Sequence, residues 1–510
     1  MSFSTVLSAS IQGLKVEFIH VEADVSNGLP AFHMVGYLSS EVKEAAERVR
    51  TAIRNSGLDF PAKKTVINLS PATMRKRGAA FDLPIAVSIL VSLGQLSQES
   101  VGKMLLIGEL SLDGCVQKVP GILPVVLEAR NAGIPICMVP LANAPEGALV
   151  DGIQVIGVRS LGEAFCFLAG SKKIEAQPHP VEKACEKDAQ MLDYSDVQGQ
   201  EAVKRAAEVA VAGGHNLLLV GPPGSGKSMV AKRIPSIFPP MTMEESMEIT
   251  KVYSIMGLVD KEAPLIRQRP FRSVHHTATK AALIGGGLIP APGEISLAHG
   301  GVLFLDELPE FQKAVLEVLR QPLEEHQIRI SRSCGNYIFP ANFMLVSAMN
   351  PCPCGCYPDF ERCTCTPGQI QNYLGKISQP FLDRMDICVE APKVKYKALK
   401  SSKKQESSAQ IRERVCLARE IQNQRYAGTA IISNAMLDVK ELDTYCSLGR
   451  KENLLMEQAF ASLRLTARTY HKILKVARTI ADLEGADRIR EKHIKEAIGY
   501  RTMDKKYWGR

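Results

Sequence analysis

The residues best suited to chemistry lie in a glycine-rich segment that follows a short apolar run. Gly221-Pro-Pro-Gly-Ser-Gly-Lys227-Ser228 comes after Asn216–Val220 and before a helical stretch, Met229–Ile234. This is the G-x-x-x-x-G-K-[ST] pattern in its strand–loop–helix context, which predicts a phosphate loop for ATP and Mg²⁺. Backbone N–H groups and the helix N-terminus bind phosphates, the lysine reaches the β- and γ-phosphates, and the serine hydroxyl binds Mg²⁺. The predicted nucleotide-binding residues are Gly221, Pro222, Pro223, Gly224, Ser225, Gly226, Lys227 and Ser228.

Two further apolar runs end in polar side chains. The run that starts at Gly301 ends in Asp306 and Glu307, and the run that starts at Phe343 ends in Asn350. Asp306 is expected to hold Mg²⁺ and Glu307 to polarise the attacking water. The Asn350 amide both donates and accepts, so it can contact the γ-phosphate or that water. The acids could instead cap the following helix, and Asn350 could form a turn before a proline.

The composition is that of an ordinary globular protein, with 510 residues, 45% hydrophobic and 23% charged. Chains of this length usually form two to four domains. The net charge of +8 suits a nucleic-acid partner without requiring one. The first residues do not resemble a signal peptide, and the longest apolar stretch, Leu83–Leu93, is too short to span a bilayer. We therefore expect a cytoplasmic protein with no membrane partner.

Changes in composition along the chain predict its organisation. The N-terminal part alternates apolar runs such as Val16–Val25 and Thr65–Asn68 with helical stretches such as Ser39–Ser56. Two charged segments predict linkers; the first contains two prolines, and the second is rich in lysine and serine. The C-terminal part is predicted to be nearly all helical, for example at Leu465–Leu483. The expected divisions are an α/β domain at 1–170, a linker at 171–192, an ATPase core at 193–392, a linker at 393–410 and a helical lid at 411–510.

Thirteen cysteines are present, and five of them fall between Cys352 and Cys365. In a reducing compartment such a cluster indicates metal binding rather than disulfides. Two C-x-C pairs supply four thiolates, the number that a tetrahedral Zn²⁺ takes. The candidate zinc ligands are Cys352, Cys354, Cys363 and Cys365. The alternative is a reduced, metal-free turn shaped by the neighbouring prolines and glycine.

At the level of longer motifs the sequence resembles the ComM/YifB family of magnesium-chelatase-like AAA+ proteins, over nearly the whole chain. The motifs that carry the resemblance are GLPAFHMVG at 28–36, FDLPIAV at 81–87, IGELSLDG at 107–114, PGEISLAHGGVLFLDELPEF at 292–311, NPCPCG at 350–355, CTPGQIQNYLGKISQPFLDRMD at 365–386 and ARTIADLEG at 477–485. The resemblance implies an α/β fold: an AAA+ phosphate-loop NTPase core with a helical lid, preceded by a domain similar to the Lon-protease domain and to domain 2 of ribosomal protein S5.

The family also implies roles for residues outside the phosphate loop. Arg384 resembles an arginine finger that completes a neighbouring subunit's site, which implies a ring, expected to be a homo-hexamer. Arg468 resembles the second sensor on the lid, which reaches back to the γ-phosphate. Residues 327–343 predict two strands around a turn, and the family places a pore-facing hairpin there. Its candidate DNA contacts are Arg329, Arg332 and Tyr337. From the residues alone, all of these arginines could be solvated surface cations.

The N-terminal domain resembles a protease domain without its catalytic pair. Ala80 falls at the position of the serine nucleophile and Leu123 at that of the lysine, so we expect the fold without peptidase activity. A short basic run, Arg75–Arg77, could contact DNA or form a solvated turn.

Three functions are compatible with these features. The family implies a hexameric, ATP-dependent DNA motor, a branch-migration helicase that acts on single-stranded and branched DNA in natural transformation and homologous recombination. Other recombination proteins are expected partners. A magnesium-chelatase-like ATPase that remodels a partner protein would have a similar core. The third alternative is an ATP-switched scaffold for recombination factors, against which Glu307 argues because a switch has less need of a water-polarising base.

Overall fold

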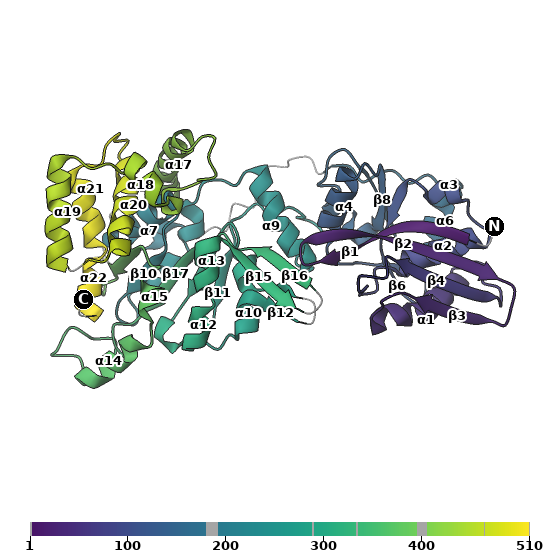
Figure 1. Cartoon of the computed structure of the whole chain (residues 1–510), viewed down its shortest axis with the longest axis horizontal. Coiled ribbons are helices and arrows are strands. Elements are labelled where there is room, and N and C mark those ends of the chain that lie inside the picture. The colour runs from purple at the N-terminus through teal and green to yellow at the C-terminus, as the bar shows by residue number, and fades with distance from the viewer. Residues whose placement is uncertain are drawn as a thin grey trace.

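The computed structural model describes residues 3–179, 192–287, 290–332, 335–394, 405–463 and 465–508. Figure 1 shows an elongated chain with the N-terminal part at one end, a central α/β part, and a helical part at the other end. Most of the first predicted linker and the middle of the second lie outside the described residues, and helix α17 begins at Ser408, within the second. No helix in the described ranges is long and apolar enough to cross a membrane.

The N-terminal part is built on a seven-stranded mixed sheet with the strand order β3-β4-β2-β1-β5-β8-β9. Its strands are β1 Phe3–Gln12, β2 Lys15–Ser26, β3 Ala31–Val35, β4 Lys64–Ser70, β5 Met104–Leu106, β8 Ile136–Pro140 and β9 Gln154–Val158, and a small hairpin joins β6 Glu109–Leu110 to β7 Val116–Gln117. The predicted strands are confirmed. The sequence analysis missed β1, whose serines at alternate positions weaken the apolar signal although Ser4 and Ser8 are buried.

Helices pack against this sheet through apolar faces. They are α1 Ser40–Asn55, α2 Asp82–Ser92, α3 Gln98–Val101, α4 Ile122–Asn131, α5 Ala144–Gly147 and α6 Leu161–Leu168. Helix α1 buries Val42, Ala45 and Val49 on one side, as its spacing predicts, and every residue of α2 is buried. The sequence analysis expects the basic run Arg75–Arg77 to contact DNA or to form a solvated turn. For Lys76 this expectation is wrong, because the side chain is fully buried and donates to the Pro71 carbonyl.

The central part contains a five-stranded sheet in the order β11-β14-β17-β10-β18, with every pair of neighbours parallel. Its strands are β10 Leu217–Val220, β11 Phe271–Val274, β14 Val302–Leu305, β17 Met344–Met349 and β18 Ile387–Glu390. The three central strands, β14, β17 and β10, are buried throughout, which fits their continuous apolar sequences. This parallel sheet with flanking helices is the α/β fold of a phosphate-loop ATPase.

Short helices and two hairpins complete the central part. The helices are α7 Glu201–Gly213, α8 Lys227–Ala231, α9 Met243–Ile255, α10 Lys280–Ile284, α11 Glu294–Leu297, α12 Lys313–Glu317, α13 Arg320–Glu325, α14 Pro367–Gly375 and α15 Gln379–Leu382. One hairpin pairs β12 Gly285–Gly286 with β13 Ala291–Pro292, and the other pairs β15 Gln327–Arg332 with β16 Gly335–Pro340. The second confirms the pair of strands predicted before β17.

The C-terminal lid is helical, as predicted. It comprises α17 Ser408–Arg425, α18 Val439–Tyr445, α19 Arg450–Leu463, α20 Ala467–Leu483, α21 Glu491–Gly499 and α22 Thr502–Trp508. Apolar residues of α20 and α17 share one hydrophobic cluster with α7 and with strands of the central sheet. Burying that shared cluster fixes the lid against the core, because separating the two would expose a large apolar area to water.

Candidate active site

The phosphate loop joins β10 to α8 at the carboxyl edge of the central sheet. Because β17 lies beside β10, β14 lies beside β17 and all three strands are parallel, the residues that follow them reach the same edge. They surround a cleft of about 410 Å³. The cleft is lined by Pro223, Gly224, Ser225, Gly226, Lys227, Ser228, Met229, Asp306, Glu307, Met349 and Asn350. The fold therefore brings together three motifs that are far apart in the sequence.

Lys227 is held by oxygen atoms of the loop and of the β17 terminus. Its Nζ donates to the Gly221 carbonyl at 2.7 Å, to the Pro222 carbonyl at 3.0 Å and to Asn350 Oδ1 at 3.1 Å. Burial lowers the pKa of this lysine, although the charge of Asp306 opposes the shift. A bound phosphate would supply the negative charge that favours the ammonium form. The contact with Asn350 puts that amide within reach of the same phosphate.

A second contact joins the groups expected to hold Mg²⁺. Ser228 Oγ donates to Asp306 Oδ2 at 2.7 Å, and Asp306 Oδ1 accepts from the backbone N–H of Glu307 at 2.9 Å. A hydroxyl and a carboxylate this close supply the oxygen ligands that Mg²⁺ prefers, with water and phosphate oxygens completing the shell. The donor set thus fits Mg²⁺ bound to a nucleotide.

Glu307 occupies an uncommon backbone conformation. Its φ is +51°, in the left-handed region, and its side chain is 60% exposed towards the cleft. Non-glycine residues adopt this region rarely, and such strain is most often found at functional sites. The exposed carboxylate of Glu307 is accessible to a water molecule.

His276 is a member of the site that the sequence analysis did not assign to it. It follows β11, the strand beside β14, and its Nδ1 lies 3.5 Å from Glu307 Oε2. Its ring also stacks near His275 and meets the edge of Phe311. The imidazole is therefore placed to orient the carboxylate expected to polarise water. The contact arises because β11 and β14 are neighbours in the sheet, and no motif in the sequence indicates it.

The cysteine cluster lies directly beyond Asn350. The four Sγ atoms of Cys352, Cys354, Cys363 and Cys365 lie within 4.8 Å of one another. Hydrogen bonding from the backbone N–H of Cys356 lowers the pKa of Cys354 to about 5, which favours the thiolate. This loop also touches the phosphate loop: Gly355 has a φ of +78°, and a Cβ placed there would lie 2.3 Å from Pro223 Cδ.

Arg384 and Arg468 lie together at the opposite, amino edge of the sheet. Both contact one carboxylate oxygen, Glu324 Oε1, with Arg384 Nη2 at 2.6 Å and Arg468 Nη2 at 3.3 Å. The expectation that Arg468 reaches back to the γ-phosphate is therefore wrong for the chain's own phosphate loop. The lid docks against the amino edge and carries Arg468 to the side where Arg384 lies.

The three candidate DNA contacts on the β15–β16 hairpin differ in exposure. Arg329 and Arg332 are exposed, and Arg329 forms a long ion pair with Glu325 at 3.6 Å. Tyr337 is buried, with 4% exposed, and packs against Gly13 in the β1–β2 turn. The prediction of an exposed stacking ring is therefore wrong for this conformation. Because side chains alternate along a strand, Ile338 faces out instead, with 52% exposed.

Ala80 and Leu123, which align with protease catalytic positions, lie in one hydrophobic cluster of the N-terminal part. Met247 and Leu265 of the central part pack against the same cluster. The region of the missing catalytic pair is thus a contact surface between the two parts of the chain.

Comparison with known proteins agrees with this arrangement. Family models of the magnesium chelatase subunit ChlI match residues 193–399 and 21–143, and a model of the C-terminal part of that subunit matches 405–501. The chain is 43% identical to competence protein ComM of Haemophilus influenzae over 99% of this chain and 98% of that protein, and 43% identical to YifB of Salmonella typhimurium with the same coverage. It is also 27% identical to Lon protease 2 of Bacillus subtilis over 31% of this chain and 33% of that protease.

Removing the lysine or the acid of the cleft should separate binding from turnover. Lys227→Ala should abolish nucleotide binding or hydrolysis, because the charge that meets the phosphates is lost. Glu307→Gln should keep ATP affinity and lower turnover by about a hundredfold or more, because the binding groups remain while the base is lost. Fluorescent-nucleotide binding and phosphate release measure the two effects. Glu310→Gln, an exposed acid in the same segment, is the control and should change neither.

Loss of His276 should affect turnover more than binding. His276→Gln should lower kcat by roughly threefold to fivefold with little change in KM, because a partly exposed contact of this kind contributes up to about 1 kcal/mol. His275→Gln, beside it in the sequence, is the matched control. Equal losses in the two variants would show that the histidines only support the loop.

Proposed function

The chain belongs to the ComM/YifB family of magnesium-chelatase-like AAA+ ATPases, and from this membership we propose that it is an ATP-driven motor for single-stranded and branched DNA. The name of the Haemophilus relative associates the family with competence, the uptake of DNA by cells. The proposed role is branch migration during natural transformation and homologous recombination, carried out in the cytoplasm. Other recombination proteins are its proposed partners.

One observation supports the proposal: the residues predicted for the two halves of an ATPase site lie at opposite edges of one sheet. The phosphate loop, Asp306 and Glu307 lie at the carboxyl edge, whereas Arg384 and Arg468 lie near Glu324 at the amino edge. An arginine that offsets transition-state charge must reach the γ-phosphate, so here it would come from a neighbouring copy. Head-to-tail contacts of this kind close into a ring, which we take to be a hexamer.

In this ring each subunit's own residues have defined tasks. Lys227 and the backbone of the phosphate loop hold the triphosphate, and Ser228 and Asp306 hold its Mg²⁺, which neutralises developing charge. Glu307 orients the attacking water and accepts its proton, with His276 fixing the carboxylate. Asn350 contacts the γ-phosphate and so links its presence to the loop that follows β17. Arg384 and Arg468 of the neighbouring copy complete the site.

The β15–β16 hairpin is the proposed contact with DNA. Its position immediately before β17 supports this, because movement of the strand that ends in Asn350 is transmitted to it directly. The exposed cations Arg329 and Arg332 would bind phosphates, an interaction that weakens steeply with salt. Tyr337 would join them only after leaving its place against Gly13.

The decisive experiment measures ATP hydrolysis and DNA remodelling together. ATPase activity should rise with single-stranded or forked DNA and lose that stimulation at high salt, and the protein should displace strands and migrate three-way and Holliday junctions. Glu307→Gln protein run alongside should do neither. DNA-independent hydrolysis with no remodelling would favour the chelatase-type alternative, and slow hydrolysis with ATP-gated partner binding would favour a scaffold.

The split site predicts complementation between two inactive variants. Arg384→Ala should bind ATP and lose turnover, and mixing it with Lys227→Ala should restore part of the activity at interfaces that combine an intact loop with an intact arginine. Arg320→Ala, an exposed cation on α13, is the control and should stay active. Full turnover by Arg384→Ala alone would contradict the assignment.

We also propose that the four cysteines hold a structural Zn²⁺. Tetrahedral coordination with Zn–S bonds of about 2.3 Å separates the sulfurs by about 3.8 Å. Separations of 3.3 Å, 3.8 Å and 3.6 Å among Cys352, Cys354 and Cys363 support the fit. The Tyr357 backbone N–H, 3.4 Å from Cys352 Sγ, would stabilise that thiolate. Zinc here would brace the loop that packs on Pro223.

Metal analysis should find about one zinc per chain. Cys352→Ser combined with Cys354→Ser should lose the metal and weaken ATP binding, because Gly355 no longer supports the phosphate loop. Cys356→Ser, which changes a cysteine outside the cluster, should keep both properties. Fully active protein without zinc would reject the proposal.

A further inference from the structure

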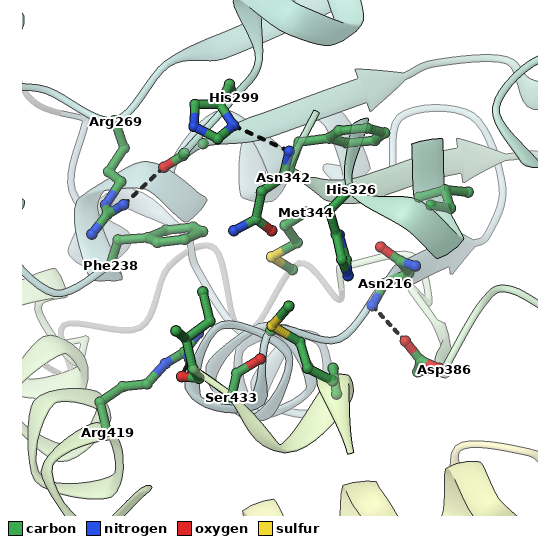
Figure 2. A pocket seen from close by; sticks show the side chains of 18 of the residues that line it. Asn216, Phe238, Arg269, His299, His326, Asn342, Met344, Asp386, Arg419 and Ser433 are labelled. Carbon is green, nitrogen blue, oxygen red and sulfur yellow. Dashed lines mark hydrogen bonds between the residues drawn. The ribbon is translucent and has the colours of Figure 1, made fainter. Parts of the chain in front are cut away.

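A second cavity, much larger than the ATP cleft, separates the central part from the lid. Its volume is about 910 Å³, and it lies at the amino edge of the central sheet. One wall of the cavity is formed by residues at or just before the start of three strands: Asn216, Gly301 and Met344. Residues of α17 and α20 form the opposite wall. The ATP cleft lies at the opposite edge, so the two are separate. Figure 2 shows the side chains of both parts around this cavity.

The carboxylates of the cavity are already engaged. Glu245 pairs with Arg269, Glu248 with His299, Glu324 with Arg384 and Arg468, Asp386 with Lys472, and Asp383 accepts from Gln379. Two cations of the lid, Arg419 and Lys475, have no carboxylate within 4 Å among the described residues. They donate to backbone carbonyls instead: Arg419 to those of Val211 and Ile432, and Lys475 to that of Ala435.

Burial disfavours the charged form of both cations. Burial and the charge of Arg269 lower the pKa of Arg419 to about 10, and burial lowers that of Lys475. The Nε–H groups of Arg269 and Arg419 are buried without an acceptor among the described residues.

The remaining walls offer both apolar and amide surface. Arg269 lies over the Phe238 ring at 5.5 Å from its centroid, and Figure 2 shows Met344 and the Asn342 side chain on the same side of the cavity. Ser433 lies beside Arg419 at the lid. Cationic groups next to an aromatic ring and amides suit a ligand that carries phosphates on an organic body, and the volume falls in the range of small-molecule sites.

We propose that this core–lid cavity binds a small phosphate-bearing anion, held by Arg419 and Lys475 of the lid with the core side chains Phe238 and Asn342 opposite them. Arginine is suited to phosphate because its planar fork donates two parallel hydrogen bonds. The arginine pair at Glu324, which the proposed ring uses for the neighbour's ATP, lines the same cavity, but Arg419 and Lys475 are not part of that pair. Because the ligand contacts both parts, it would hold the lid in its docked position.

Direct binding to the full chain tests the proposal independently of DNA. In a Lys227→Ala background, where the phosphate loop lacks the charge that meets the phosphates, the protein is titrated calorimetrically with ADP and separately with inorganic triphosphate. One site per chain should remain, and Arg419→Gln or Lys475→Gln added to Lys227→Ala should raise its Kd by about tenfold or more, the effect of one charge-assisted hydrogen bond. Arg412→Gln, on the same helix but outside the cavity lining, should leave Kd unchanged.

The outcomes distinguish the sources of the phosphate. Binding of ADP alone identifies a nucleotide site, and binding of both probes identifies a site for free phosphates; both support the proposal. Absence of binding by either probe, or binding that Arg419→Gln and Lys475→Gln leave intact, overturns it. If neither probe binds and Arg419→Gln impairs ring assembly in sedimentation, the cavity belongs to the contact between copies instead. Thermal unfolding of each variant confirms that it is folded.

Discussion

The polarity of the five-stranded parallel sheet is the constraint on which the rest of the site depends. All strands end at one edge, so the groups that handle the triphosphate must gather there, and Lys227, Asp306 and Asn350 do so. The same polarity leaves the opposite edge for Arg384, whose backbone immediately precedes β18. A change of side-chain rotamer cannot bring the Arg384 guanidinium to the carboxyl edge of its own sheet, because the two edges are a whole strand length apart. In the proposed chemistry one chain therefore supplies either the triphosphate or the arginine to a given site, never both.

The position of the lid follows from the same geometry. The apolar face of α20 is buried with α7 and α17, and Lys472 on that helix pairs with Asp386 just before β18 at 2.9 Å. Asp386 is a buried carboxylate whose pKa is lowered, despite its burial, chiefly by the charge of Lys472. A buried pair of this kind is costly to break once formed, since separation leaves an uncompensated charge. The lid is thus fixed at the amino edge, where Arg468 joins Arg384 and the large cavity forms.

The sequence predicted the fold and the ATP cleft well because both depend on local patterns. Buried parallel strands are continuous apolar runs, and the polar residue after each run marks the active edge, so β10, β14 and β17 were identified directly. The contacts that were missed depend on tertiary packing. His276 meets Glu307 only because β11 lies next to β14, and the edge reached by Arg468 depends on how the lid docks. Tyr337 was assigned to the wrong face because alternation does not say which face of a hairpin another domain covers.

Among the described residues, that covering domain contacts the central part at α9 and at the β15–β16 hairpin. Ser254, in α9, donates to the buried Glu146 carboxylate, and its carbonyl accepts from the Gly121 N–H at 2.9 Å. At the second place the β1–β2 turn packs against the hairpin, where a Cβ on Gly13 would lie 3.0 Å from Tyr337 Cδ1. The first contact anchors the N-terminal part to α9, since hydrogen bonds to a buried charge are worth about 1.5–3 kcal/mol each. A hairpin that moves relative to α9 must therefore also move relative to Gly13. In the proposed motor the N-terminal domain then takes part in the movement, because the β1–β2 turn must move away before the Tyr337 side chain can become exposed.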